Sequence, residues 1–301
     1  HLVVDWKKLP VKQAVYFDTH DNRMIFVIPR QGKTYIGTTD TFYTGELKNP
    51  KITADDRDYL LKCVNNYFPG NNIKSDDVES CWAGLRPLID KPGKKPSEIP
   101  RKDEMFISNS GLITIAGGKL TGYRKMAQRI VDKIAGKIAI VEKKIIPKCS
   151  TSGIRLSGGK TINGLSFKDL LKDKMAQGLS IGLSEQEVTL LINRYGSNIL
   201  QLYTIAEQLK NEKKNNAKQE NELPLFLHMQ LKYSIENEMC VSPCDFFVRR
   251  TGMIYFDINT INKWRKPILL CMQDLLSWTD EQTCKLDLEL QTALDEMNSI
   301  K

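Results

Sequence analysis

The chain has 301 residues, a formal net charge of +8, 41% hydrophobic residues and 27% charged residues, a composition typical of a globular protein of about two domains. No apolar run reaches the ~18 residues of a membrane-spanning helix, and the first ten residues lack the layout of a signal peptide. The positive charge suits nucleic acid, a membrane surface or an anionic small molecule, but the basic residues are not grouped with aromatic platforms, so we expect no nucleic-acid binding.

The cysteines and histidines favour reduced thiols without a metal. The seven cysteines are odd in number and form no CxxC motif, which argues against both a disulfide framework and a zinc site. Only three histidines occur, His1, His20 and His228, so we expect no structural metal. Both features are typical of a cytoplasmic protein. The chain begins with His1 rather than methionine, and we therefore expect it to be a fragment.

The first third of the chain reads as strands followed by one helix. Apolar segments at Ala14–Asp18, Met24–Pro29 and Lys33–Asp40 predict strands, and the short turns between them favour antiparallel pairing. Thr53 is a suitable N-cap for a helix that the residues Phe68–Gly70 would end.

The middle of the chain contains an unusual turn. Segments 104–108 and 111–117 predict a hairpin, and the stretch AGGKLTGYRKMA (Ala116–Ala127) then predicts a tight turn and a helix reaching about Ala135. The two glycines would let a strand and a helix approach closely. Alternatively, the backbone N–H groups and the positive helix end would bind an anion. The local sequence leaves both interpretations open.

The second half of the chain is predicted to be helical. Residues 136–165 include a turn-rich segment, and we place a domain boundary near residue 148. Helical periodicity begins at about Ser166, and capping boxes occur at Ser184–Glu187 and Thr279–Gln282. The sequence thus predicts an α+β fold, in which an antiparallel sheet portion precedes a small α-helical domain.

Three basic residues lie beside turns and are candidates for anion binding, namely Arg86, Arg101 and Lys119. Arginines in rigid settings suit bidentate binding of a phosphate or carboxylate. The alternative is that each arginine pairs with a nearby carboxylate such as Asp90 or Glu98.

His1 and a pair of arginines are the other candidates. His1 adjoins the apolar segment HLVV and could transfer a proton near neutral pH, although a first residue is commonly frayed. The segment VRRT (Val248–Thr251) could bind an anion or form surface salt bridges. The chain contains no GxGxxG motif, P-loop or nucleophile elbow.

Several motifs taken together resemble the aerobic, FAD-dependent glycerol-3-phosphate dehydrogenases of Gram-positive bacteria. The resemblance covers nearly the whole chain, and the order of the motifs is more specific than any one of them. The motifs, in order, are HLVV, AVYFD, RMIFVIP, YIGTTDTFYTG, SCWAGLRPLID, KPSEIPRKDE, GLITIAGGKLTGYRKMA and DFFVRRTG.

The resemblance implies a division of the chain. Residues 1–110 would carry the substrate-binding portion, 111–147 the returning strand and helix of the FAD-binding domain, and 148–301 the C-terminal helical domain. The family's N-terminal FAD-binding segment with its GxGxxG turn would precede His1, so we expect the fragment alone to be inactive.

The resemblance also assigns the flavin site. Gly117, Gly118, Lys119, Leu120 and Thr121 match the family's GGKLT turn, which lies against the FAD. The backbone there would approach the isoalloxazine ring, and the helix start would favour negative charge on the reduced flavin.

The substrate implied by the resemblance is sn-glycerol 3-phosphate, which is oxidised to dihydroxyacetone phosphate. Arg86 and Arg101 match the arginines that hold the phosphate, and Lys119 adds positive charge near flavin and substrate. His1 would take the proton of the C2 hydroxyl as hydride passes to the flavin, so that His1, Arg86 and Lys119 form the catalytic set. Pro100 stands where the family usually has serine, which puts local contacts in doubt.

The remaining expectations concern partners and alternatives. Only residues 88–95 separate the GLRP and PSE motifs, which favours a dehydrogenase that passes electrons to a quinone pool over an oxidase. The enzyme would be cytoplasmic and peripheral at an anionic membrane surface, and a homodimer stays open. The alternatives are a non-catalytic basic binding module, with positive residues spread over a convex face, and part of a glycine-oxidase-like amine oxidase.

Overall fold

The computed structural model describes residues 1–86, 88–89, 93, 99, 102–159, 164, 166–215 and 223–298. Its first part is a five-stranded sheet with the strand order β2-β3-β4-β1-β5, in which every neighbouring pair is antiparallel. The predicted strands and their antiparallel pairing are therefore confirmed. The strands are β1 (Leu2–Asp5), β2 (Val15–Asp18), β3 (Met24–Arg30), β4 (Lys33–Gly37) and β5 (Val78–Cys81).

The two faces of this sheet differ because side chains alternate along each strand. One face packs against helix α1 (Ala54–Tyr67), where Leu2 and Ile36 of the sheet and Leu60 of the helix are fully buried. Thr53 caps α1 in a capping box, as the sequence predicted. The opposite face carries aromatic side chains, and this face holds the candidate site.

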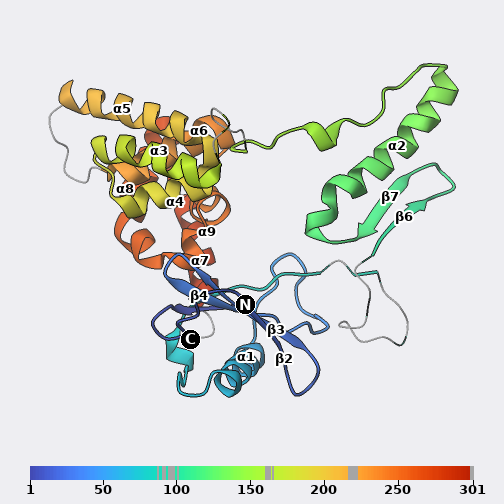
Figure 1. The fold of residues 1–301 in the computed structure, drawn as a ribbon, viewed down its shortest axis with the longest axis horizontal. Coiled ribbons are helices and arrows are strands. Elements are labelled where there is room, and N and C mark those ends of the chain that lie inside the picture. The colour runs from blue at the N-terminus through green and yellow to red at the C-terminus, as the bar shows by residue number, and fades with distance from the viewer. Residues whose placement is uncertain are drawn as a thin grey trace.

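A separate unit follows the sheet. Strands β6 (Asp103–Ile107) and β7 (Ile113–Gly117) pair as a hairpin, and a short 3₁₀ turn, η3 (Leu120–Gly122), then leads into helix α2 (Tyr123–Glu142). The predicted hairpin, turn and helix are confirmed. The unit extends away from the five-stranded sheet and from the helical domain (Figure 1).

Helix α2 runs beyond the predicted end near Ala135 to Glu142 and stops at Lys143, which adopts a left-handed conformation with φ of 51°. A single glycine costs about 1 kcal/mol in a helix interior. Gly136 is therefore tolerated inside α2, and the periodic apolar residues after it continue the helix.

The C-terminal part is helical, as predicted from Ser166 onward. Both predicted capping boxes are confirmed. Ser184 and Glu187 each accept a hydrogen bond from the backbone N–H of the other, and Thr279 and Gln282 do the same. Two hydrophobic clusters form the core of this domain. Its helices are α3 (Phe167–Ser180), α4 (Glu185–Tyr195), α5 (Ile199–Asn215), α6 (Leu225–Glu238), the π-helical η6 (Asp245–Arg250), α7 (Met253–Phe256), α8 (Ile258–Leu276) and α9 (Asp280–Asn298).

The helical domain contacts the edge strand β5 of the sheet through α7 and α9 (Figure 1). The Ser80 hydroxyl donates a hydrogen bond to the Tyr255 carbonyl over 2.7 Å, and the Cys81 thiol donates to the Met297 carbonyl over 3.2 Å. The rings of Trp82 and Tyr255 lie 5.0 Å apart. These contacts fix the helical domain beside the aromatic face of the sheet. None of the described helices is long and apolar enough to cross a membrane.

Candidate active site

His1 is held firmly on the aromatic face of the sheet. Its ring stacks on the Trp82 indole, with centroids 4.7 Å apart and planes 19° apart, and it lies 5.4 Å from the Phe26 ring. The backbone nitrogen of His1 donates to the Trp82 carbonyl over 2.8 Å. Rings at these separations attract one another beyond simple burial. The imidazole is therefore packed in one place rather than frayed.

Gly37, the last residue of β4, provides the space for this ring. A Cβ atom added at Gly37 would lie 2.9 Å from His1 Cδ2 and 3.0 Å from Phe26 Cζ. Any side chain at this position would therefore displace the imidazole. Glycine is required at position 37 because the backbone of β4 lies directly against the His1 ring.

Arg86 is fixed by the loop that follows Gly37. Its Nη1 donates to Asp40 Oδ2 over 2.6 Å, and its Nη2 donates to Thr38 Oγ1 over 3.4 Å. The interpretation that this arginine pairs with a carboxylate is confirmed, with Asp40 as the partner. A guanidinium carries five N–H donors, so Asp40 can orient Arg86 while other donors bind an anion.

The loop of residues 37–40 thus brings His1 and Arg86 to one place. β4 ends at Gly37 beside β1, whose first residue follows His1. Sequence reasoning missed Thr38, Asp40 and Trp82 as supporting residues. All three residues lie in the motifs YIGTTD and SCWAGLRP, which the sequence analysis singled out. They were missed because the contacts of Arg86 with Thr38 and Asp40 join residues more than 40 positions apart.

The double-glycine turn has a clear packing role. Gly117 and Gly118 adopt φ values of +76° and +93°, and a Cβ at Gly117 would lie 2.3 Å from the Lys102 carbonyl oxygen. A Cβ at Gly118 would lie 2.5 Å from Met126 Sδ. Gly117 therefore lets the end of β7 pass against the backbone of Lys102, and Gly118 lets the turn lie against the Met126 side chain of α2.

The same turn is connected to the Arg86 segment. The Ile89 side chain lies 3.2 Å from the position that a Cβ at Gly117 would occupy. The chain that follows Arg86 therefore passes over the end of β7. This contact joins Ile89 to the end of the hairpin unit.

The outer side of the turn is open. Lys119 is exposed, and Leu120 is 91% exposed. Thr121 lies in η3, and the N-cap of α2 is Gly122, which has no side chain to cap the first amide groups. The Tyr123 amide donates to the Leu120 carbonyl, whereas the positive end of the helix favours an anion. Exposed apolar side chains favour a flat ring system. The turn therefore fits a flavin as well as a packing role.

The remaining candidates are placed as follows. Arg101 and its suggested partners Asp90 and Glu98 lie outside the described residues, so the expected convergence of Arg86, Arg101 and Lys119 stays a prediction. In the segment VRRT, Arg249 Nη1 donates to Asp245 Oδ1 over 2.7 Å, which confirms the salt-bridge interpretation for this residue.

The cysteines and the possible metal ligands were also located in the structure. None of the seven cysteines forms a disulfide bond. Among the residues that the structure describes, no group of His, Cys, Asp and Glu side chains is arranged to hold a metal ion.

Two protein families match parts of the chain. Residues 1–124 match the family described as FAD dependent oxidoreductase, and residues 149–283 match the C-terminal domain of alpha-glycerophosphate oxidase. The chain is 48% identical over 282 residues to an aerobic glycerol-3-phosphate dehydrogenase of Bacillus subtilis, covering 94% of this chain and 50% of that protein. It is 44% identical over 297 residues to the enzyme of the same name from Staphylococcus haemolyticus, covering 98% and 52%.

A solved structure gives the same result. The glycerol-3-phosphate dehydrogenase from Bacillus halodurans, complexed with FAD, superposes with a TM-score of 0.84 at 44% identity, covering 98% of this chain and 56% of that chain. Fold and sequence together define the class as FAD-dependent oxidoreductases. Within this class, the chain belongs to the family of the aerobic glycerol-3-phosphate dehydrogenases, as the order of its motifs predicted. It spans about half the length of the curated relatives that it matches.

Proposed function

We propose that this chain forms the substrate-binding and C-terminal helical parts of an FAD-dependent enzyme that oxidises sn-glycerol 3-phosphate to dihydroxyacetone phosphate. The observation that carries the proposal is the loop of residues 37–40, which packs on His1 and binds Arg86. This loop would thereby position a candidate base and a candidate phosphate-binding group for one substrate.

The proposed cofactor is FAD, which when bound supplies the acceptor for the hydride from C2 of the substrate. Gly117, Gly118, Lys119, Leu120 and Thr121 would hold it, because their turn combines open backbone with exposed apolar surface. The uncapped start of α2 would favour negative charge beside it.

Arg86 would bind the phosphate of the substrate. Asp40 and Thr38 hold the guanidinium in one orientation, which lowers the entropic cost of binding. Arg101 and Lys119 would add charge-assisted contacts to the same dianion. Since binding energy from the phosphate positions the reacting carbon, this cluster would contribute to rate as well as affinity.

His1 would act as the base. Its imidazole would accept the proton of the C2 hydroxyl, so that the C2–O bond could become a carbonyl as C2 loses its hydride. Trp82 and Gly37 fix the plane of the ring, so the ring nitrogen is aligned before the substrate arrives.

The finer parts of the proposal concern organisation and electron transfer. Residues 1–110, 111–147 and 148–301 would form the substrate-binding portion, the returning part of the FAD domain and the helical domain. Electrons would leave for a quinone at an anionic membrane surface, which the net charge of +8 supports. The 301-residue chain alone would not turn over, because it contains no GxGxxG turn for the phosphates of the FAD.

The test is an anaerobic visible spectrum of the full-length protein before and after addition of sn-glycerol 3-phosphate. We expect a flavin band that bleaches with this substrate and does not bleach with glycine. The variant Arg86→Ala should need a higher substrate concentration for the same bleaching, whereas the control Arg249→Ala, whose guanidinium pairs with Asp245, should behave like the parent.

Two other results would contradict the proposal. Bleaching by glycine but not by sn-glycerol 3-phosphate would support the amine-oxidase alternative. Folded protein without a flavin band would support the basic binding module.

A further inference from the structure

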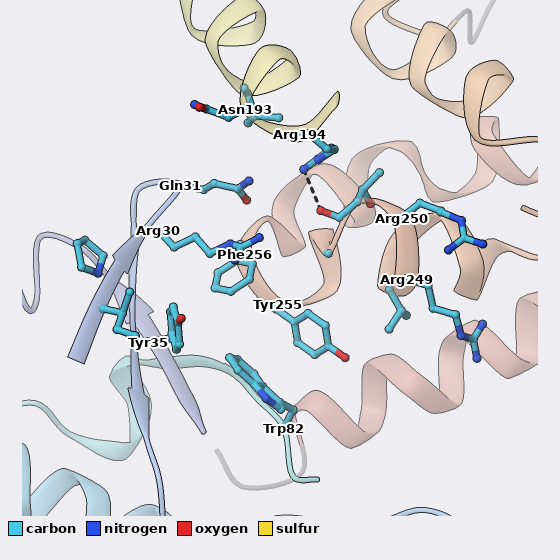
Figure 2. Close-up of a pocket in the computed structure, with 16 residues that line it drawn as sticks. Arg30, Gln31, Tyr35, Trp82, Asn193, Arg194, Arg249, Arg250, Tyr255 and Phe256 are labelled. Carbon is cyan, nitrogen blue, oxygen red and sulfur yellow. Dashed lines mark hydrogen bonds between the residues drawn. The ribbon is translucent and has the colours of Figure 1, made fainter. Parts of the chain in front are cut away.

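A cavity lies between the sheet and the helical domain (Figure 2), with a volume of about 860 Å³. One wall is the turn between β3 and β4, and the other is formed by α4 and residues 248–256. Among the described residues, no Asp or Glu lines this cavity. Four arginines line it: Arg30, Arg194, Arg249 and Arg250.

Arg30 and Arg194 face each other from opposite walls. Arg194 donates to Gln230 Oε1 over 2.5 Å and to the Thr251 carbonyl over 2.8 Å, and both acceptors are neutral. Desolvation lowers the pKa of Arg194, and the positive charge of Arg30 contributes to this lowering. Two cations of like sign across a cavity repel each other, and an anion bound between them would remove this repulsion.

The other two arginines are engaged elsewhere. Arg249 pairs with Asp245, and Arg250 donates to the Glu238 carbonyl. Figure 2 shows their guanidinium groups turned away from the other lining side chains, whereas Gln31 and Asn193 lie at the end of the cavity near Arg30 and Arg194. Hydrogen-bond donors therefore gather at that end.

The neighbouring part of the cavity is aromatic and begins beside Arg30. Tyr35 and Trp82 come from the sheet, and Tyr255 and Phe256 come from α7. The rings of Trp82 and Tyr255 lie 5.0 Å apart, and the Arg30 guanidinium lies 5.0 Å from the centre of the Phe256 ring. Such a wall suits a flat apolar group.

We propose that this cavity binds a phosphate monoester with an aromatic body. The phosphate would lie between Arg30 and Arg194, and the aromatic body would lie against Trp82 and Tyr255. The site uses neither Arg86 nor the glycine turn, so it is independent of the proposed function. Because Trp82 also stacks on His1, a ligand here would contact the side chain that positions the candidate base.

The test is isothermal titration calorimetry of the full-length protein with phenyl phosphate, with inorganic phosphate and phenol as separate probes. We expect phenyl phosphate to bind more tightly than either probe. Arg30→Gln and Arg194→Gln should each weaken its binding by about tenfold or more, since each removes a charge-assisted hydrogen bond. The matched control Arg249→Gln and the variant Arg86→Ala should leave its affinity unchanged.

Several results would overturn the proposal. These are no binding of phenyl phosphate, unchanged affinity in Arg30→Gln, loss of binding in Arg86→Ala, or equal affinity for inorganic phosphate. Because Arg194 also bonds Gln230 and Thr251, folding of Arg194→Gln is checked by circular dichroism. If Arg194→Gln does not fold, the affinity of Arg30→Gln alone tests the proposal.

Discussion

Helices α1 and α2 have similar amphipathic sequences, but the surroundings of their apolar side chains differ. In α1, Leu60 and Val64 are fully buried against the five-stranded sheet. In α2 none of the residues is buried, and Val131 and Ile140 are 58% and 80% exposed. Periodicity is enough to predict both helices, whereas the stabilisation by burial depends on a second surface.

This difference points to the role of the hairpin unit. An apolar helix face gains free energy only when another surface removes it from water. In the family, a further FAD-binding segment would provide that surface, which agrees with the proposed division at residues 111–147. Substitutions in the two helices test this difference in stabilisation by burial.

The largest expected effect is in the buried helix. Leu60→Ala should lower the free energy of unfolding of the 301-residue chain by about 2–5 kcal/mol, because it leaves a cavity in a closed core. Val131→Ala, which truncates an exposed apolar side chain of α2, should alter it by less than about 0.5 kcal/mol. Urea unfolding followed by circular dichroism measures both.

Measuring the free energy of unfolding of the same two variants in the full-length protein tests whether a further segment covers α2. If a further segment covers α2, Val131→Ala should become clearly destabilising there. Equal, large costs for both variants in the 301-residue chain would show that α2 is already covered, and would contradict the comparison.

A smaller effect is expected in the glycine turn. Gly117→Ala should destabilise the protein by more than about 1 kcal/mol and weaken flavin binding, since it combines a positive φ with a clash against the Lys102 carbonyl. Gly136→Ala in α2 meets no atom within 4 Å and should stabilise the helix by up to about 1 kcal/mol. Thermal unfolding and flavin retention during gel filtration distinguish the two, and a harmless Gly117→Ala would contradict the account.

The smallest effect concerns an ion pair at the turn between β2 and β3. Hydrogen bonds from Arg23 hold the pKa of Asp21 well below its usual range. A lowered folded-state pKa contributes stability above the unfolded pKa, and this contribution is lost as pH falls through the folded value. Asp21→Asn should therefore cost about 0.2–1 kcal/mol at pH 7 and progressively less at acidic pH. A cost that does not change with pH would exclude the ion pair as its cause.

Local structure was largely predictable from the sequence. The Thr53 cap, the hairpin before Gly117 and the helices after Ser166 follow from short-range patterns that depend on neighbouring residues. The predicted end of α2 near Ala135 is wrong, because the helix continues through Gly136 to Glu142.

The arrangement of the site was less predictable, because it depends on contacts that are distant in sequence. Arg86 pairs with Asp40, and His1 stacks on Trp82. No periodicity connects such residues, and only the order of strands in the sheet brings them together. The resemblance supplied His1 and Arg86, but not the residues that hold them in place.

The central claim is that one loop positions a base and a phosphate-binding arginine for the same substrate. Anaerobic stopped-flow reduction of the flavin in the full-length protein by sn-glycerol 3-phosphate tests it directly. His1→Gln should lower the limiting rate by about 10²–10⁴-fold with little change in the half-saturating concentration. Arg86→Ala should raise that concentration by about tenfold or more. A limiting rate unchanged in His1→Gln, or a half-saturating concentration unchanged in Arg86→Ala, would contradict the account.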